Sequence, residues 1–226
     1  MIVVTGASKG LGRAIADRLH SNGHEVHGIA RTEILNAEFS SSVCDVTSPD
    51  ALQAFAKKLK LEKKQLLGLV NAAGVASMNL AVTTTFKVTR NIIETNLLGS
   101  ILTCQLLAPL MYRNKKGSII NFSTIAVPLG LKGESIYVAS KAGVEGFTRS
   151  FAREAGDFGV RVNCIAPGPI KTDLIAGVSD ASIDKIIQQQ ILRKMFSPSD
   201  ISDLVELLFD PKADSISGQI LNVGGF

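Results

Sequence analysis

The N-terminal segment constrains the fold most strongly, because a strand, a glycine-rich loop and a helix follow one another without a break. Ile2, Val3 and Val4 form a β-branched run, which favours a strand. Thr5-Gly-Ala-Ser-Lys-Gly-Leu-Gly12 follows, and helical apolar spacing begins at Ala14. Glycines let the backbone approach a pyrophosphate closely, and a helix N-terminus supplies unpaired N–H groups. The glycine spacing departs from the Gly-x-Gly-x-x-Gly of most dinucleotide folds, and a glycine turn without a ligand is the alternative.

Strand-like and helix-like segments alternate along the rest of the chain. We expect strands at 25–30, 42–46, 66–70, 118–122, 161–166 and 219–223, and helices at 11–22, 50–60, 84–112, 137–156 and 200–209. The segment between Arg31 and Cys44 is too short for the helix that commonly crosses there, so we expect a loop. Repeated strand–helix alternation predicts an α/β fold with a parallel sheet covered on both faces. Ligands of such sheets bind beyond the carboxyl ends of the strands.

The composition is that of an ordinary soluble globular protein. Of 226 residues, 46% are hydrophobic and 19% are charged, which suits one domain over residues 1–226. The formal net charge of +4 is modest. Lysines near the expected helix 50–60 alternate with apolar residues, as on an amphipathic helix with one wet face; they are Lys57, Lys58, Lys60, Lys63 and Lys64, interleaved with Leu52, Phe55, Leu59 and Leu61. We therefore expect no nucleic-acid partner.

The apolar stretch and the cysteines indicate where such a chain works. The longest apolar stretch, residues 97–112, is interrupted by polar residues and Pro109 and is too short to span a bilayer, so no membrane partner is expected. Cys44, Cys104 and Cys164 lie far apart in the sequence. An odd number of cysteines without paired spacing favours free thiols in a reducing compartment, which predicts a cytoplasmic protein.

The histidines give no metal signature. His20, His24 and His27 cluster near the end of the first expected helix, across a turn that contains Gly23. This spacing does not match a metal-ligand pattern. We expect surface histidines and no metal site.

A tyrosine and a lysine four positions apart are the strongest catalytic signal. Tyr137 and Lys141 lie in a segment with helical character, so their side chains share one face. An ammonium beside a phenol stabilises the phenolate and lowers a pKa that is ~10 when unperturbed. Proton transfer near neutral pH then becomes possible. The same spacing also occurs on ordinary solvated helix faces, so the pair needs support from the rest of the sequence.

Further motifs, in order along the chain, supply that support. They are Thr5-Gly-Ala-Ser-Lys-Gly-Leu-Gly12, Cys44-Asp45-Val46, Asn71-Ala-Ala-Gly74, Asn96-Leu-Leu-Gly99, Ile119-Ile-Asn-Phe-Ser-Thr124, Tyr137-Val-Ala-Ser-Lys141 and Asn163-Cys-Ile-Ala-Pro-Gly168. With these motifs the chain resembles the short-chain dehydrogenase/reductase family, in the subgroup that includes 3-oxoacyl-[acyl-carrier-protein] reductases, along essentially its whole length. The resemblance implies a Rossmann-like, doubly wound, parallel seven-stranded sheet. It also implies hydride transfer between a nicotinamide and a carbonyl or alcohol carbon.

The resemblance implies catalytic roles for four side chains. Tyr137 would protonate the carbonyl oxygen during reduction, and Lys141 would lower the phenol pKa and bind the nicotinamide ribose. Asn96 would hold, through its helix, a water that relays protons to Lys141. The family usually has serine thirteen positions before the tyrosine; Thr124 stands there and keeps a hydroxyl but adds a methyl group. Ser123 is the alternative, but a one-residue step on an extended segment points to the opposite face, which favours Thr124.

The resemblance also implies a set of cofactor-binding residues. Besides Tyr137 and Lys141, these are Gly6, Ser8, Lys9, Gly10, Leu11, Gly12, Arg31, Asp45, Val46, Asn71, Ala72, Gly74, Pro167, Gly168, Ile170 and Thr172. A ribose 2′-hydroxyl calls for an acid after the second strand, whereas a 2′-phosphate calls for arginine or lysine. Arg31 and Lys9 suit a phosphate, so NADP(H) is favoured over NAD(H), with Glu33 as the reservation. Asp45 would meet the adenine.

Two longer segments bear on substrate and assembly. Residues 173–196 resemble the substrate-covering lid of the family. The apolar positions of this segment indicate an apolar or acyl substrate, or else simply pack on the domain; they are Ile183, Ile186, Ile187, Ile191 and Leu192. The helices expected at 84–112 and 137–156 usually form a four-helix bundle between subunits in this family, so a homodimer or homotetramer is expected.

The leading functional hypothesis is an NADPH-dependent carbonyl or 3-oxoacyl reductase. One alternative is an NADP(H)-binding sensor or scaffold without turnover, which the threonine at position 124 would allow. A third hypothesis is an NAD-dependent alcohol dehydrogenase. The sequence leaves these alternatives open, as it does the identity of the substrate.

Overall fold

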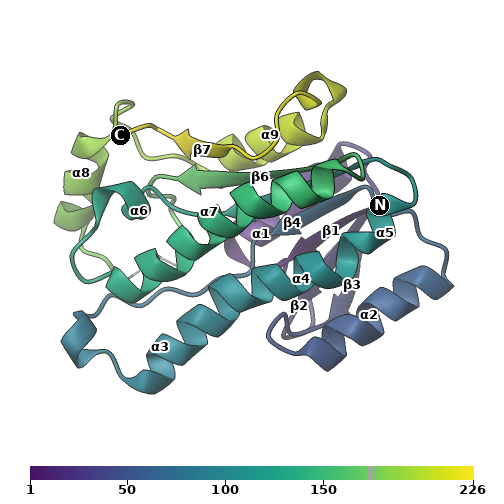
Figure 1. Cartoon of the computed structure of the whole chain (residues 1–226). Helices are drawn as coiled ribbons and strands as arrows, with labels where there is room; N and C mark the ends of the chain where they lie inside the picture. Colours follow the sequence, from purple (N-terminus) through teal and green to yellow (C-terminus); the bar gives the residue numbers. More distant parts are fainter. Residues whose placement is uncertain (173–174, 176) are drawn as a thin grey trace.

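A single parallel sheet forms the centre of the molecule (Figure 1). The computed structural model describes residues 1–172, 175 and 177–226. The sheet order is β3-β2-β1-β4-β5-β6-β7, and every pair is parallel. The strands are β1 (Ile2–Thr5), β2 (Val26–Ala30), β3 (Ser40–Val43), β4 (Gly68–Asn71), β5 (Gly117–Phe122), β6 (Val160–Pro167) and β7 (Ile220–Val223). The predicted doubly wound α/β fold is therefore confirmed.

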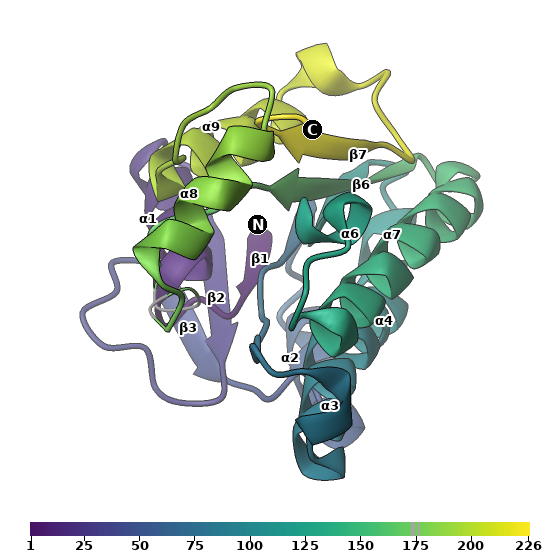
Figure 2. The same ribbon diagram turned by 90° about the vertical axis from the view of Figure 1, so that its left-hand side faces the viewer.

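Helices cover both faces of this sheet (Figure 2). On one face lie α1 (Gly10–Ser21) and α9 (Pro198–Phe209); on the other lie α2 (Pro49–Leu61), α4 (Gly99–Leu107) and α7 (Ser135–Gly156). The remaining elements are η1 (Ala81–Thr83), α3 (Phe86–Ile93), the π-helical turn η2 (Glu94–Leu98), α5 (Pro109–Tyr112), α6 (Ala126–Leu129), α8 (Asp180–Gln189) and η4 (Pro211–Ala213).

The core consists of two apolar clusters, one on each face of the sheet. Ile15 and Leu19 of α1 pack with Ile201 and Val205 of α9 in one cluster. The other cluster contains residues of α2, α4 and α7, among them Leu52, Phe55, Leu59, Leu107 and Phe151. The sequences of strands that are buried on both faces are continuous apolar runs. Three consecutive β-branched residues were therefore enough to predict β1.

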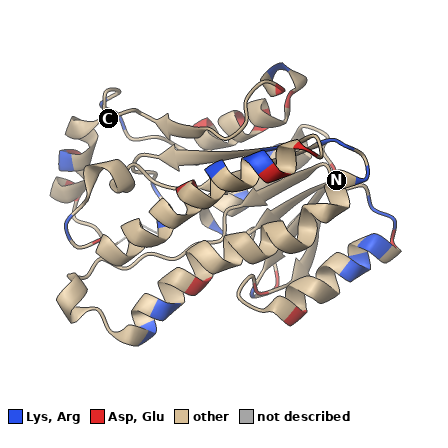
Figure 3. Cartoon of the chain, in the orientation of Figure 1, with Lys and Arg blue, Asp and Glu red and all other residues tan. Residues whose placement is uncertain are grey.

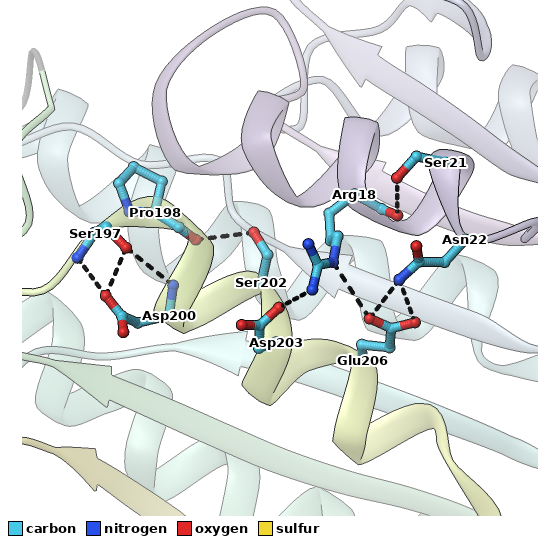
Figure 4. A network of polar contacts seen from close by, with 9 residues as sticks. All are labelled: Arg18, Ser21, Asn22, Ser197, Pro198, Asp200, Ser202, Asp203 and Glu206. Carbon is cyan, nitrogen blue, oxygen red and sulfur yellow. Dashed lines mark hydrogen bonds and ion pairs between the residues drawn. The ribbon is translucent and has the colours of Figure 1, made fainter.

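Polar contacts join α1 to α9 at the surface (Figure 4). Arg18 of α1 is ion-paired with Asp203 and, at 3.5 Å, with Glu206 of α9. Ser197 begins α9 with a capping box, in which its side chain and that of Asp200 each accept a backbone N–H. These contacts are partly exposed, so each of them adds little to the stability of the fold.

Strand boundaries agree with the sequence except at β3. The sequence predicted a strand at 42–46, but β3 spans Ser40–Val43 and the chain then turns, with Asp45 accepting hydrogen bonds from Thr47. This exposed edge strand consists mainly of polar serines. The sequence-based prediction relied on the apolar residues that follow them, so it placed the strand too close to the C-terminus. The connection from Arg31 to Phe39 contains no helix, as expected.

Two side-chain placements correct the sequence interpretation. His27 is buried on β2, where its ring contacts Phe55 and its Nε2 lies 2.9 Å from Ser42 Oγ; burial lowers its pKa. The prediction of a surface histidine fails because β2 has a neighbour on both sides and both faces are covered. Leu61, expected on the apolar face of α2, is exposed at the end of that helix.

The helix predicted at 84–112 is confirmed as one continuous helical run from Phe86 to Tyr112. By length and composition it is long and apolar enough to cross a membrane, which corrects the sequence estimate of a stretch too short to do so. Half of its most apolar window is buried inside the molecule. Leu107 and Met111 of this run lie in the core beside α2, as in a core helix of a globular protein.

All three cysteines are buried and free, as the sequence predicted. Burial raises the pKa of the Cys44 thiol to about 11 and those of Cys104 and Cys164 to about 12. Thiolate is the reactive form, so these groups are structural and unreactive in the folded chain.

A steric constraint at Gly159 gives a test of the fold. Gly159 has a φ of +70°, and a Cβ there would lie 2.3 Å from the carbonyl oxygen of Lys115. We expect Gly159→Ala to lower the free energy of unfolding by about 1–3 kcal/mol, measured by urea denaturation. Gly156→Ala is the matched control, because no atom lies within 4 Å of a Cβ there. Equal stability of the two variants would contradict the described turn.

Candidate active site

One large cavity, of about 1100 Å³, lies beyond the carboxyl ends of the strands. The segments that follow β1, β2, β3, β4, β5 and β6 all contribute lining residues. Parallel pairing brings these strand ends to the same edge of the sheet, so segments distant in sequence share one wall. This is the place where ligands of open α/β sheets bind.

The glycine loop after β1 forms a cradle in this cavity. A Cβ at Gly6 would lie 2.8 Å from Ala73 Cα, and one at Gly12 would lie 2.4 Å from the Gly6 carbonyl oxygen. Gly10, with a φ of +58°, has no atom within 4 Å of a Cβ position. The first two glycines are therefore required by packing, and Gly10 leaves open space in the cavity wall. These features fit a pyrophosphate, because the backbone stays accessible.

The N-terminus of α1 is well suited to an anion. Among the described residues no side chain caps α1, whereas Ser48 caps α2 by accepting the N–H of Ala51. The first turn of α1 contains no acidic residue. Unsatisfied N–H groups and the helix dipole favour negative charge at such an end. Lys9, at the N-cap, also lines the cavity.

The segment after β2 lines the far end of the same cavity. Arg31, Thr32 and Glu33 all belong to the lining and are exposed. Arg31, which suits a 2′-phosphate, and Glu33, which suits a ribose 2′-hydroxyl, are thus both in this wall. This is the reservation about cofactor choice that the sequence raised. Figure 3 shows the wider charge distribution: basic and acidic residues share the same helices rather than gathering on separate faces.

Tyr137, Lys141 and Thr124 meet in the cavity. Tyr137 and Lys141 lie on the first turns of α7 and are 8% and 6% exposed. The Lys141 Nζ donates a 2.8 Å hydrogen bond to the Phe122 carbonyl oxygen and lies 6.0 Å from the centroid of the Tyr137 ring. Thr124, just beyond β5, lies close enough to Tyr137 for its hydroxyl to lower the pKa of the phenol. The face of α7 that carries Tyr137 and Lys141 is therefore buried and is not an ordinary solvated helix face.

Burial controls the protonation of this pair. The pKa of Tyr137 is raised well above its usual value, first by burial and then by the nearby Glu134, while the Thr124 hydroxyl acts in the opposite direction. Burial also lowers the pKa of Lys141 to about 8. The sequence expectation of a lowered phenol pKa is wrong for the chain alone, because desolvation of the buried phenol is the largest effect on its pKa. Tyr137 is thus a protonated phenol, the form that donates a proton.

The structure distinguishes Thr124 from Ser123. Ser123 is 3% exposed, and its hydroxyl donates a 2.7 Å hydrogen bond to Glu145, which is also paired with Arg149. The Thr124 hydroxyl oxygen accepts the N–H of Ala126 at 3.2 Å, and the same hydroxyl lowers the pKa of the Tyr137 phenol. The Ser123 hydroxyl is therefore occupied by its hydrogen bond to Glu145 of α7. The hydroxyl that lies beside the Tyr137 phenol is that of Thr124.

Asn96 acts on the backbone beside the site. It lies fully buried in η2, where its side chain accepts the N–H of Val75 at 2.8 Å and donates to the Val75 carbonyl oxygen at 2.9 Å and to Ser140 at 3.0 Å. A Cβ at Gly74 would lie 3.4 Å from Asn96 Oδ1 and 3.7 Å from Lys141 Nζ. Asn96 thus holds the segment after β4 next to Lys141, and its role in a proton relay stays a prediction.

The predicted cofactor residues reach the cavity with two exceptions. Those that line it are Gly6, Ser8, Lys9, Gly10, Leu11, Gly12, Arg31, Val46, Ala72, Gly74, Tyr137, Lys141, Pro167, Gly168, Ile170 and Thr172. Asp45 is not among the lining residues and instead stabilises the turn after β3. Asn71 is also absent from the lining; its amide donates to Cys104 and Asn121 in the core.

The opposite side of the cavity is mainly apolar. Its residues are Met78, Ile125, Ala126, Leu131, Glu134, Ile175, Val178, Ile183 and Ile186. Ile183 and Ile186 belong to α8, so part of the expected lid does face the cavity, while Ile191 and Leu192 are exposed. Residues 173, 174 and 176 of the expected lid lie outside the described residues. Sequence reasoning missed Glu134, although its position three residues before Tyr137 was the available signal.

Comparisons with known proteins agree with this geometry. Residues 6–226 match the family model described as Enoyl-(Acyl carrier protein) reductase. The chain is 34% identical to the 3-oxoacyl-[acyl-carrier-protein] reductase FabG of Vibrio cholerae and 33% identical to that of Escherichia coli, over 99% of this chain and 95% of each relative.

Solved structures are similar as well. An aldohexose dehydrogenase of Thermoplasma acidophilum superposes with a TM-score of 0.90 at 31% identity, over 99% of this chain and 92% of that one. A 4-hydroxyisoleucine dehydrogenase complexed with NADH gives a TM-score of 0.90 at 26% identity, over 99% and 97% of the two chains.

Fold, site and comparisons together define a dinucleotide-binding oxidoreductase. The chain belongs to the short-chain dehydrogenase/reductase family, whose members act on carbonyl and alcohol groups.

The buried ammonium gives a test based on stability. The pKa of Lys141 is about 8 in the folded chain, below the usual ~10.4 of a lysine in an unfolded chain. Between these two pH values the unfolded chain therefore holds a proton on Lys141 that the folded chain has lost. Below pH 8 both states are protonated, and burial of the charged ammonium lowers the free energy of unfolding by its full amount. This penalty disappears as the pH rises toward 10.5. We expect Lys141→Met to gain stability relative to the parent chain at pH 7, and this difference to shrink by pH 10, measured by urea denaturation. A difference independent of pH would contradict a buried, charged Lys141.

Proposed function

We propose that the chain is an NADP(H)-dependent reductase of carbonyl groups, with 3-oxoacyl compounds as one candidate substrate class. The observation that supports this most is the meeting of Tyr137, Lys141 and Thr124 beside the glycine loop in one cavity. The names of the curated relatives, 3-oxoacyl-[acyl-carrier-protein] reductases, support the acyl class.

A nicotinamide cofactor would supply the hydride in this site. The loop Gly6–Gly12 and the α1 N-terminus would hold the pyrophosphate, and Lys141 the nicotinamide ribose. The segment from Pro167 to Thr172 would hold the nicotinamide end. These assignments suit the residues present, since open backbone at Gly10 and an uncapped helix end favour phosphate oxygens.

The side chains of the site would bind the substrate and move one proton. Thr124 would donate a hydrogen bond to the carbonyl oxygen, and the Tyr137 phenol would donate the proton that this oxygen takes up. Lys141 would stabilise the phenolate left behind, because it lies beside the ring and stays largely protonated at neutral pH. The apolar wall would limit access of water and strengthen these interactions.

The charges after β2 support NADP(H), with NAD(H) as a second candidate. Arg31 would pair with a 2′-phosphate, and Lys9 lines the same cavity. Glu33 also lines it and would instead accept a ribose 2′-hydroxyl. The structure similar to this chain that was solved with NADH supports keeping this second candidate.

Assembly and location follow the family expectation. We propose a single domain over residues 1–226 that forms a homodimer or homotetramer through the outer faces of α4 and α7. In support, α4 contains no charged residue (Figure 3), and Leu98, in the adjoining π turn, is 44% exposed. Buried free thiols support a reducing, cytoplasmic location.

Tyrosine replacement tests the reductase proposal. We expect Tyr137→Phe to lower ketone-dependent NADPH oxidation by at least about 100-fold, and Lys141→Ala to do the same. Tyr112→Phe is the matched control, because Tyr112 stacks on Phe158 outside the cavity and should retain full activity. Tight NADPH binding without turnover of any carbonyl by the parent chain would favour the sensor or scaffold hypothesis instead.

Replacement of Arg31 and Glu33 tests cofactor choice. Arg31→Ala should weaken NADPH binding by about 10-fold or more and leave NADH binding unchanged, because only NADPH carries the 2′-phosphate. Glu33→Gln should change NADPH binding little. Titration of cofactor fluorescence measures both. The opposite pattern, with Glu33→Gln weakening NADH and Arg31→Ala without effect, would establish the NAD(H) candidate.

A further inference from the structure

Glu134 is a buried acid without a polar partner. It is 8% exposed and lines the cavity. Among the described residues, no hydrogen bond or ion pair involves its carboxylate; only its backbone is bonded, to Leu131 and Val138. Although Glu134 is the N-cap residue of α7, its side chain does not cap the helix. Neither helix capping nor charge pairing therefore explains an acid at this position.

The other buried glutamate shows what a structural acid looks like in this molecule. Glu145 accepts a 2.7 Å hydrogen bond from Ser123 and is paired with Arg149. Burying a carboxylate without such partners costs free energy, and burial raises the pKa of Glu134. In the part of the chain that the structure describes, the fully buried side-chain oxygens without a partner are those of Asn71 and Gln190 and not those of Glu134, so the Glu134 carboxylate keeps access to the cavity that it lines. A cavity-lining acid left without a partner in the free protein is a candidate for contact with a ligand.

The position of Glu134 relative to Tyr137 defines the part of a ligand that it would meet. Glu134 is the N-cap residue of α7, and Tyr137 lies three positions further on in the first turn of that helix. Both line the same cavity, and the charge of Glu134 acts on the phenol. Glu134 therefore lies next to the place where Tyr137 and Thr124 would hold a carbonyl oxygen.

We propose that Glu134 determines specificity by accepting a hydrogen bond from a hydroxyl group next to the reacting carbonyl, so that the preferred substrates are α-hydroxy ketones with an apolar remainder. This inference rests on the proposed carbonyl reductase function. Leu131, Ile183 and Ile186 in the same wall suit the apolar remainder. Lys141 and Arg31 in the cavity disfavour a cationic substrate, and Glu134 itself disfavours a carboxylate beside the carbonyl.

Matched ketones test the proposal through their relative kcat/KM values with NADPH. The probes are acetophenone, α-hydroxyacetophenone and phenylglyoxylate, which differ only in a methyl, hydroxymethyl or carboxylate group beside the carbonyl. We expect the preference for the hydroxy ketone over acetophenone to fall at least tenfold in Glu134→Leu. Glu134→Gln keeps an acceptor without the charge, so it should retain part of this preference and accept phenylglyoxylate better. Glu154→Gln, on the exposed side of α7, is the control and should behave as the parent.

A binding measurement separates this proposal from the proposed function. The dissociation constants of phenylethanediol and α-methylbenzyl alcohol, the corresponding alcohols, are compared calorimetrically in the presence of NADPH, where no reaction follows. The diol should bind to the parent chain more tightly than α-methylbenzyl alcohol does. Glu134→Leu should reduce the ratio of the two dissociation constants at least tenfold. If the parent reduces no ketone, the carbonyl reductase function fails, and the binding ratio alone decides the role of Glu134. Substrate and binding ratios that are the same in the parent and Glu134→Leu would overturn the proposal.

Discussion

The parallel pairing of the strands is the constraint on which the site depends. Thr5 at the end of β1 is in register with Ile29 of β2 and Asn71 of β4, and Asn71 with Asn121 of β5. The loops that follow these strands therefore begin side by side. At this edge Thr5 also accepts the N–H of Ala73, and Gly6 packs against the same residue. The glycine loop is consequently held against the segment after β4, and both segments line the cavity.

Desolvation is the second organising effect. It raises the pKa of Tyr137 and lowers that of Lys141 to about 8, so at neutral pH the chain alone holds a protonated phenol beside a lysine that is still largely charged. The free energy needed to bury these groups comes from the apolar clusters on both faces of the sheet. Sites that store such a cost are typical of catalysis, because the same buried charges act strongly on a bound substrate.

The sequence predicted the fold and most of the cavity wall, because both depend on local patterns. Strand–helix alternation and parallel pairing determine which loops meet, so the glycine loop and the segments after β4, β5 and β6 were expected in one cleft, and all of them line the cavity. Lys141 was placed there through the resemblance to the family. The exposed serine strand β3 and the burial of His27 were not predicted, because they depend on which strand lies at the sheet edge. Glu134 was missed since its lack of a partner is a property of the folded molecule. The direction of the Tyr137 pKa was wrong because spacing alone shows the neighbouring ammonium but not the burial.

In the reaction proposed for this cavity, a hydride is transferred to a carbonyl carbon while Tyr137 supplies the proton. The most direct test uses NADPH deuterated at the transferring position of C4, with the alcohol product analysed by NMR. The account predicts deuterium at the carbinol carbon in product made by the parent chain, and no detectable product with Tyr137→Phe. Product without deuterium, or equal deuterium transfer by Tyr137→Phe, would contradict it.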